Sequence, residues 1–250
     1  MWLKKYTKGR GIAICLISAA LFMTLSGIYF YATGQRFATV MGVGEVEAPL
    51  LLMIDPGHGG MDGGATSLTG VEERELNLEI ALRLEALAAL YGIPTEMTRR
   101  TADIDYPEEA TTIRQKKVAD TRARVELINA ATNAVVISIH QNIYDGPSVS
   151  GPQVLFARTA TSEEFGLNMQ AALTEALGLT RPRAPTTVPR GVYIMNHIDV
   201  PAILVECGFL SNPQEEAALR TEVYQIRLAS ALLSGYIRSQ ELLRGRYFGR

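Results

Sequence analysis

From residue 50 onward, short apolar runs alternate with longer amphipathic segments, and this alternation limits the possible folds more than any other feature. The apolar runs are short enough for strands and lie at 50–54, 93–98, 135–139, 154–157, 192–195 and 202–206. The amphipathic segments have helical length and lie at 71–91, 113–131, 162–177 and 219–239. Strands that alternate with helices are typical of an α/β domain with a largely parallel sheet. In such sheets, the loops at the carboxyl ends of the strands form the functional site.

The first part of the chain contains a long segment without charge, residues 11–32. A helix needs about 20 apolar residues to cross a bilayer. Segment 1–10 is basic, and positive charge marks the cytoplasmic side of a membrane helix. We therefore expect a cytoplasmic flank at 1–10 and a transmembrane anchor, or uncleaved signal, at 11–32. A cleaved signal peptide is the alternative, although its apolar part usually has about 7–15 residues.

The rest of the chain divides into a tether and one globular domain. Residues 33–49 contain glycines and a proline without helical or strand periodicity, which predicts a short tether. The domain is expected at 50–240, followed by a C-terminal tail at 241–250.

Charge and cysteine content exclude two classes of protein. All 26 acidic residues lie at or after Glu45, and residues 45–250 carry a net charge of −7. Such a domain has no general electrostatic attraction to nucleic acid. The two cysteines, Cys15 and Cys207, are too few for a disulfide framework.

Two of the three histidines, His58 and His140, follow directly after predicted strands. A single histidine at such a place is usually structural, but two at equivalent strand ends indicate a shared site. Two imidazoles and one carboxylate are the ligand set of many catalytic zinc sites, in which water takes the fourth position. The third histidine, His197, lies in a polar loop. It could be a third metal ligand or a substrate contact, but we expect a role at the surface or behind the ligands.

The carboxylate candidates for a third ligand are Glu72, Glu73 and Glu75, at the start of the helix predicted at 71–91. At 100° per residue, Glu73 points in the same direction as the apolar stripe that begins at Leu76, whereas the other two point aside. An inward-facing glutamate in a first turn could also simply interact with the helix dipole.

Glu206 ends an otherwise apolar strand. A carboxylate there must be paired, bound to metal or used in proton transfer, because an unpartnered charge in an apolar environment is costly. Cys207 is a possible nucleophile, but we interpret it as a small packing residue. The loop 55–64 holds five glycines and can fold closely around a ligand, yet it lacks the GxxxxGK[ST] pattern of a phosphate-binding loop.

Five motifs resemble the zinc-dependent N-acetylmuramoyl-L-alanine amidases, in particular their membrane-anchored, sporulation-associated CwlD-like type. The motifs lie at 54–65 (IDPGHGGMDGGA), 70–84, 97–99 (MTR), 124–142 and 201–216 (PAILVECGFLSNPQEE). The family fold is a mixed, largely parallel sheet flanked by helices, which agrees with the alternation described above.

The resemblance implies that His58, Glu73 and His140 bind one Zn²⁺ and that Glu206 is the catalytic residue. Arg124, Ser138 and Asn142 also match family positions, where they are expected to support the metal loop and the sheet.

The resemblance further implies hydrolysis of the amide bond between N-acetylmuramic acid and L-alanine in peptidoglycan. For the sporulation type, it implies maturation of the spore cortex and formation of muramic-δ-lactam. The domain is then expected outside the cytoplasm, held at the membrane by its N-terminal helix. A protein activator or a homodimer is left open. The alternatives are a zinc peptidase that acts on the stem peptide and a catalytically idle wall-binding protein.

Overall fold

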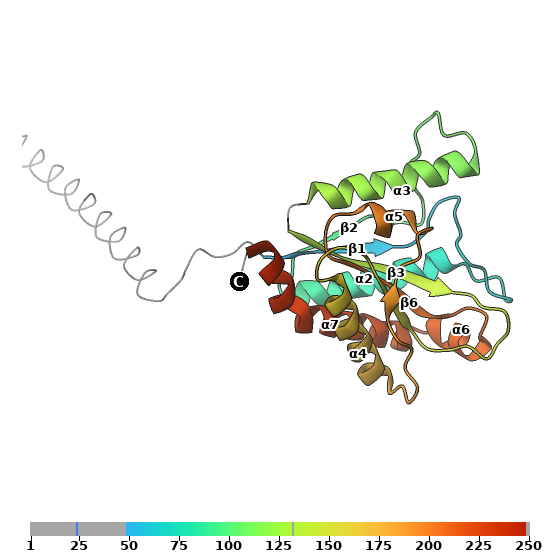
Figure 1. Ribbon diagram of the computed structural model, residues 1–250. Coiled ribbons are helices and arrows are strands. Elements are labelled where there is room, and N and C mark those ends of the chain that lie inside the picture. The colour runs from blue at the N-terminus through green and yellow to red at the C-terminus, as the bar shows by residue number, and fades with distance from the viewer. Residues whose placement is uncertain (1–23, 25–48, 132, 249–250) are drawn as a thin grey trace, which may run out of the picture. The chain divides into compact units, whose positions relative to one another are not determined.

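The computed structural model describes residues 24, 49–131 and 133–248 (Figure 1). The anchor expected at 11–32 and the tether expected at 33–49 therefore lie almost entirely outside the described residues. Within the described part of the chain, no helix is both long enough and apolar enough to cross a membrane.

The described strands form one sheet of six strands in the order β2-β1-β3-β6-β4-β5. The strands are β1 (Leu51–Pro56), β2 (Thr95–Met97), β3 (Ala134–Asn142), β4 (Gln153–Phe156), β5 (Thr186–Thr187) and β6 (Ala202–Phe209). Neighbouring strands are parallel except for β4 and β6, which pair antiparallel. The sheet is thus mixed and largely parallel, as predicted.

Helices cover both faces of this sheet. They are α2 (Glu73–Leu90), α3 (Ile113–Ala130), α4 (Ser162–Leu177), α5 (Tyr193–His197), α6 (Pro213–Leu219) and α7 (Glu222–Phe248). Figure 1 shows α3 and α5 on one side of the sheet and α2, α4 and α7 on the other. Because helices cover both faces, β1 is buried on both, and its residues 51–54 are continuously apolar instead of alternating.

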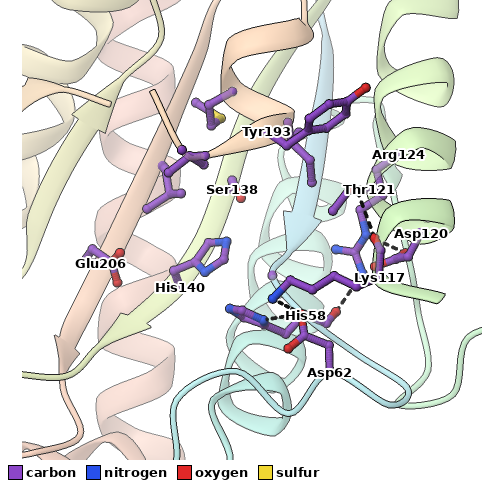
Figure 2. Close-up of a pocket in the computed structure, with 16 residues that line it drawn as sticks. His58, Asp62, Lys117, Asp120, Thr121, Arg124, Ser138, His140, Tyr193 and Glu206 are labelled. Carbon is purple, nitrogen blue, oxygen red and sulfur yellow. Dashed lines mark hydrogen bonds and ion pairs between the residues drawn. The ribbon is translucent and has the colours of Figure 1, made fainter. Parts of the chain in front are cut away.

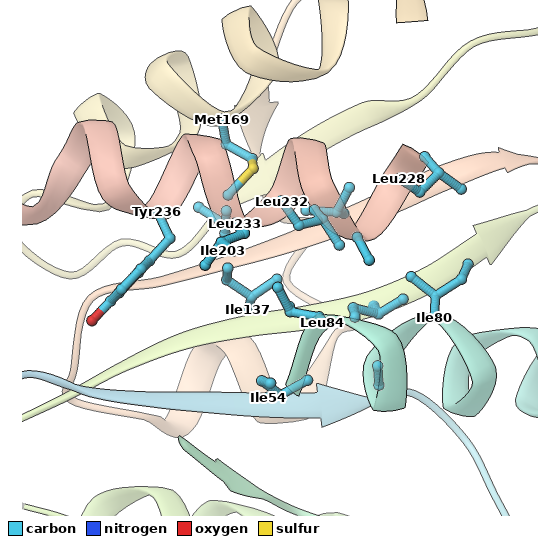
Figure 3. Packing of buried hydrophobic residues seen from close by; sticks show 14 of the residues in the cluster. Ile54, Ile80, Leu84, Ile137, Met169, Ile203, Leu228, Leu232, Leu233 and Tyr236 are labelled. Carbon is cyan, nitrogen blue, oxygen red and sulfur yellow. The ribbon is translucent and has the colours of Figure 1, made fainter. Parts of the chain in front are cut away.

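Two hydrophobic clusters fill the spaces between the layers. In β1, Leu52 and Ile54 face the larger cluster, and Met53 faces the smaller one. The larger cluster joins the sheet to α2, α4 and α7, and Figure 3 shows Ile80 and Leu84 of α2 opposite α7. This packing fixes α2 against the sheet and so determines where its first residues lie.

Local signals explain where several helices begin. The side chain of Thr112 accepts a hydrogen bond from the Gln115 N–H in a capping box that starts α3. Asn212 caps α6, whose first residue is Pro213.

Two predicted elements differ from the structure. The run 192–195, which the sequence predicts as a strand, lies in and next to the short helix α5. The prediction was wrong because so short an apolar run shows neither a helical nor a strand period. The helix predicted near 219–239 is present as α7, but α7 continues into the predicted tail as far as Phe248, and α6 before it was not predicted.

Candidate active site

Four side chains singled out in the sequence meet at the carboxyl edge of the sheet. His58 follows β1, His140 lies in β3, Glu206 lies in β6, and Glu73 is the first residue of α2. Since β3 and β6 are parallel neighbours, His140 and Glu206 stand opposite each other in register. Figure 2 shows His58, His140 and Glu206 around one cavity.

His58, Glu73 and His140 are close enough to hold one ion. One ligand atom from each lies within 4.8 Å of the others. The Nε2 atom of His58 is 3.3 Å from Glu73 Oε2, and the Nδ1 atom of His140 is 2.9 Å from Glu73 Oε1. The three side chains therefore converge on a single point.

The carboxylate of Glu73 is held in place by several donors. Its Oε2 accepts a hydrogen bond from the Ala65 N–H at 2.8 Å, and its Oε1 accepts one from the Gln141 N–H at 3.0 Å. The side-chain amide of Asn77, one turn along α2, also donates to Oε1, at 3.2 Å. Glu72, by contrast, is partly exposed and forms an ion pair with Arg74, with 2.6 Å between Glu72 Oε2 and Arg74 Nη2. The choice of Glu73 by helical phase agrees with this geometry.

The electrostatics of the cluster favour positive charge at its centre. Burial alone would lower the pKa of His58, but Asp62 and Glu73 raise it to about 9. Burial alone would raise the pKa of Glu73, yet the hydrogen bonds of His140 and His58 hold that pKa well below its usual range. A site that stabilises an imidazolium in this way also suits a cation bound to the same atoms.

Asp62 and Lys117 extend the cluster on the side of His58. Asp62 Oδ2 is 2.9 Å from His58 Nδ1 and 2.8 Å from Lys117 Nζ. Because Asp62 occupies Nδ1, the Nε2 atom of His58 is left for a metal ion, an arrangement common in metal sites. Neither Asp62 nor Lys117 was predicted from the sequence. The signal for Asp62 is its place four residues after His58 in the glycine-rich loop.

Close packing explains two of the glycines in that loop. A Cβ atom at Gly57 would overlap the ring of His140, and one at Gly64 would meet Glu73 and His58. Gly64 also has a φ of 71°, and His58 itself has a φ of 60°, in the left-handed region. The loop thus brings two ligand candidates together because it lacks side chains at these points.

Two arginines hold the carbonyl groups of the same loop. Arg124 donates to Pro56 O at 2.8 Å and to His58 O at 2.7 Å, and Arg99 donates to Gly57 O at 2.9 Å. Arg124 also pairs with the fully buried Asp55 at 2.9 Å. Arg124 thus supports the loop that carries His58, as the resemblance implied.

Asp55 connects this loop to the sheet. Its second oxygen accepts a hydrogen bond from Ser138 at 2.7 Å, and Thr98 donates to the first at 2.6 Å. Burial would raise the pKa of Asp55, but Arg124, Thr98 and Ser138 hold it below its usual value. Asp55 is therefore a buried carboxylate that depends on its partners.

Arg124→Met is expected to lower the free energy of unfolding by about 3–5 kcal/mol, because the change leaves the charge of Asp55 buried without its cation. Arg122→Met, on the exposed side of the same helix, is the matched control and should change stability by less than about 0.5 kcal/mol. Guanidinium denaturation of both variants measures the difference. Equal stability of the two would show that the buried pair contributes nothing.

Glu206 faces a cavity of about 350 Å³ that His58, His140, Lys117 and Tyr193 also line (Figure 2). Its Oε2 atom is buried and has no hydrogen-bond partner within the described part of the chain. Burial, with a contribution from Glu73, raises the pKa of Glu206 to about 7, although the two histidines oppose this shift. Among the described residues, no arginine forms an ion pair with Glu206. A carboxyl group with these properties can both accept and donate a proton near neutral pH.

Three other residues considered in the sequence lie apart from this chemistry. His197 is exposed, stacks on Tyr193 and places its Nδ1 2.8 Å from the Tyr193 carbonyl, outside the cluster. Cys207 is fully buried among apolar side chains, and burial raises the pKa of its thiol, so it is a packing residue. The carbonyl of Asn142 accepts a hydrogen bond from the Leu210 N–H at 2.8 Å, which ties the end of β3 to that of β6.

Several known proteins resemble this chain in both sequence and fold. The Amidase_3 family, described as N-acetylmuramoyl-L-alanine amidase, matches residues 52–238. The germination-specific N-acetylmuramoyl-L-alanine amidase of Bacillus subtilis strain 168 is 34% identical over 189 residues, which cover 75% of this chain and 78% of that protein. The amidase LytC of the same strain is 30% identical over 190 residues, 74% of this chain but only 34% of LytC.

Among solved structures, the CwlD amidase from Clostridioides difficile, in complex with the GerS lipoprotein, has a TM-score of 0.73 and 29% identity. The match covers 77% of this chain and 99% of the CwlD chain. An N-acetylmuramoyl-L-alanine amidase from Clostridium difficile 630 has a TM-score of 0.67 and 28% identity, and covers 77% of this chain and 97% of its own. The chain belongs to the N-acetylmuramoyl-L-alanine amidase family, as its motifs predicted.

Proposed function

We propose that this amidase is zinc-dependent, with His58, Glu73 and His140 as the zinc ligands and Glu206 as the acid–base catalyst. The observation that carries the proposal is the convergence of the three ligand atoms within 4.8 Å. Glu206 stands beside them, opposite His140 in the next strand. The bond cleaved is the amide between the lactyl group of N-acetylmuramic acid and L-alanine.

The residues present fit a zinc ion by their chemistry. Two imidazoles and one carboxylate form a common catalytic zinc set that leaves a fourth position open. Asp62 fixes the tautomer of His58, and three donors fix the carboxylate of Glu73. When bound, zinc lowers the pKa of the attacking water and polarises the amide carbonyl.

Glu206 performs the two proton transfers. Its carboxylate accepts a proton from the attacking water as the new carbon–oxygen bond forms. It then gives this proton to the amide nitrogen as the carbon–nitrogen bond breaks. The products are a muramic acid carboxylate and a stem peptide with a free L-alanine amino group. The buried Oε2 atom supports this role because no described residue forms a hydrogen bond with it.

Product analysis tests this reaction. Purified peptidoglycan treated with the enzyme should release stem peptides that begin with L-alanine, as measured by mass spectrometry. A chelator should abolish the release, and added zinc should restore it, because the proposed reaction requires the bound metal. Shortened stems would instead identify a zinc peptidase, and no released peptide would identify an idle wall-binding protein. Release that persists in chelator would reject the zinc requirement.

We also propose a role in spore cortex maturation, including formation of muramic-δ-lactam. Its support is the similarity to the germination-specific amidase and to the CwlD amidase. A protein partner belongs to this proposal because the CwlD amidase was solved with the GerS lipoprotein. The uncharged segment 11–32 supports a membrane anchor that holds the catalytic domain outside the cytoplasm.

A further inference from the structure

A second hollow lies at the carboxyl edge of the sheet, with a volume of about 680 Å³. Three loops form it: the one before α2, the one after β3 and the turn between β6 and α6. We call this hollow the rim groove, and its lining residues are Thr66, Leu68, Ile143, Tyr144, Asp145, Gly146, Pro147, Ser211 and Pro213.

The rim groove and the cavity of Glu206 share no lining residue and are formed by different segments of the chain. The cavity is lined by residues of α3 and α5, which cover one face of the sheet. The rim groove is lined by the loops that lead into α2 and α6, on the other face. It begins close to the centre: Thr66 follows Ala65, whose N–H donates to Glu73, and Ile143 follows the end of β3, which carries His140.

The two hollows differ in chemistry. Charged side chains line the cavity, among them Asp62, Lys117 and Asp120. The rim groove is mainly apolar: Leu68 is 94% exposed, Tyr144 is 60% exposed and Ile143 is 51% exposed. Among its described lining residues, only Asp145 is charged, and Thr66 and Ser211 add hydroxyl groups. Exposed apolar side chains gathered around one groove indicate a binding surface.

The loops of the rim groove are held in a fixed arrangement. The Tyr144 N–H donates to Ser211 Oγ at 3.0 Å, which joins the loop after β3 to the turn after β6. The side chain of Asn212 donates to Pro147 O at 2.9 Å and to Val149 O at 3.2 Å. The Thr69 hydroxyl donates to Glu216 at 2.7 Å and so ties the third loop to α6. Ligand sites are usually preformed in this way.

We propose that the rim groove binds the glycan strand next to the muramic acid whose amide is cleaved. This inference rests on the proposed function, in which two arms of the substrate diverge from the amide. Sugars are neutral and have both C–H faces and hydroxyl groups, which match an aromatic ring, an exposed leucine and two hydroxyls. The stem peptide carries ionised groups, which match the charged cavity. The rim groove is thus the glycan subsite, with Tyr144 and Leu68 as its platform.

The test compares short and long substrates. Wild type, Tyr144→Ala and Leu68→Ala are assayed on a muramoyl peptide that carries no further sugar and on a longer glycan fragment with the same stem. Tyr91→Ala and Leu90→Ala are matched controls, since both residues are similarly exposed but lie at the far end of α2. The groove variants should lose roughly tenfold in kcat/KM on the long substrate, mainly through KM, because a lost contact worth about 1.4 kcal/mol corresponds to that factor. The controls should keep the wild-type values on both substrates.

Three results would overturn the proposal. The groove variants could show the same ratio of long to short activity as the controls. They could lose activity equally on both substrates, which would indicate a positioning role at the catalytic centre. They could lose binding to a partner protein while glycan dependence stays intact, which would make the groove a protein contact. If wild type releases no peptide from either substrate, the proposed function itself fails. If wild type is fully active and the groove variants behave like the controls, only the groove proposal fails.

Discussion

Replacement of His58, Glu73 or His140 by alanine is expected to remove both bound zinc and amidase activity. Three protein ligands are the minimum that fixes a tetrahedral site with one open position. The three ligand atoms lie within 4.8 Å of one another, so loss of any one leaves only two donors in the set. Zinc should fall from about one per chain to near background, and activity should fall with it.

The measurement is metal content by elemental analysis of the folded variants, together with peptide release from peptidoglycan. Glu72→Ala is the matched control for Glu73→Ala, because Glu72 is the preceding residue but pairs with Arg74 at 2.6 Å, away from the centre. It should retain both zinc and activity. Stoichiometric zinc in a folded His58→Ala or His140→Ala protein, or zinc loss in Glu72→Ala, would contradict this ligand set.

Glu206→Gln is expected to retain zinc and to lower turnover by ~10²–10⁴-fold, the usual contribution of a positioned acid–base group. Glutamine has the same size and a hydrogen-bonding end, but it cannot accept the proton of water. The three ligand candidates are untouched, since none of them makes a hydrogen bond to Glu206 within the described residues. The loss concerns the transition state, so directly measured substrate affinity should change little.

Zinc content and turnover measured on the same preparation separate the roles of Glu206. Loss of zinc would make Glu206 a ligand, and unchanged turnover would make it structural. Glu215→Gln offers a comparison, because Glu215 is also a partly buried glutamate but accepts hydrogen bonds from Gly151 and Phe209. Its expected effect is on stability, with zinc content preserved.

The sequence was sufficient to predict the parts of the site that depend on periodicity. The positions of β1, β3 and β6 follow from apolar runs, although β3 and β6 continue beyond their runs to Asn142 and Phe209. Parallel pairing places the carboxyl ends of these strands along one edge. The orientation of Glu73 follows from helical phase because Leu76 and Ile80 are buried on the same side. The same phase turns Leu82 away from this stripe and leaves its side chain 38% exposed.

Contacts between distant segments could not be predicted in this way. Lys117 reaches Asp62 from α3, and Arg99 reaches the carbonyl of Gly57 from the end of β2. No local period relates such pairs, since they depend on how the helices pack against the sheet. Helix α5 was missed because its five residues are too few to display a helical period.

The origin of the three ligand candidates in separate elements has a thermodynamic consequence. His58 comes from the loop after β1, Glu73 from α2 and His140 from β3, so an ion held by all three is a cross-link within the domain. Such a cross-link cannot form in the unfolded chain without closing long loops. Under the proposed zinc binding, metal binding and folding are linked, and free zinc at a hundred times its dissociation constant would add about 2.7 kcal/mol to the stability of the folded state. Zinc supply would thus control how much of this protein survives proteolysis, as well as how fast it works.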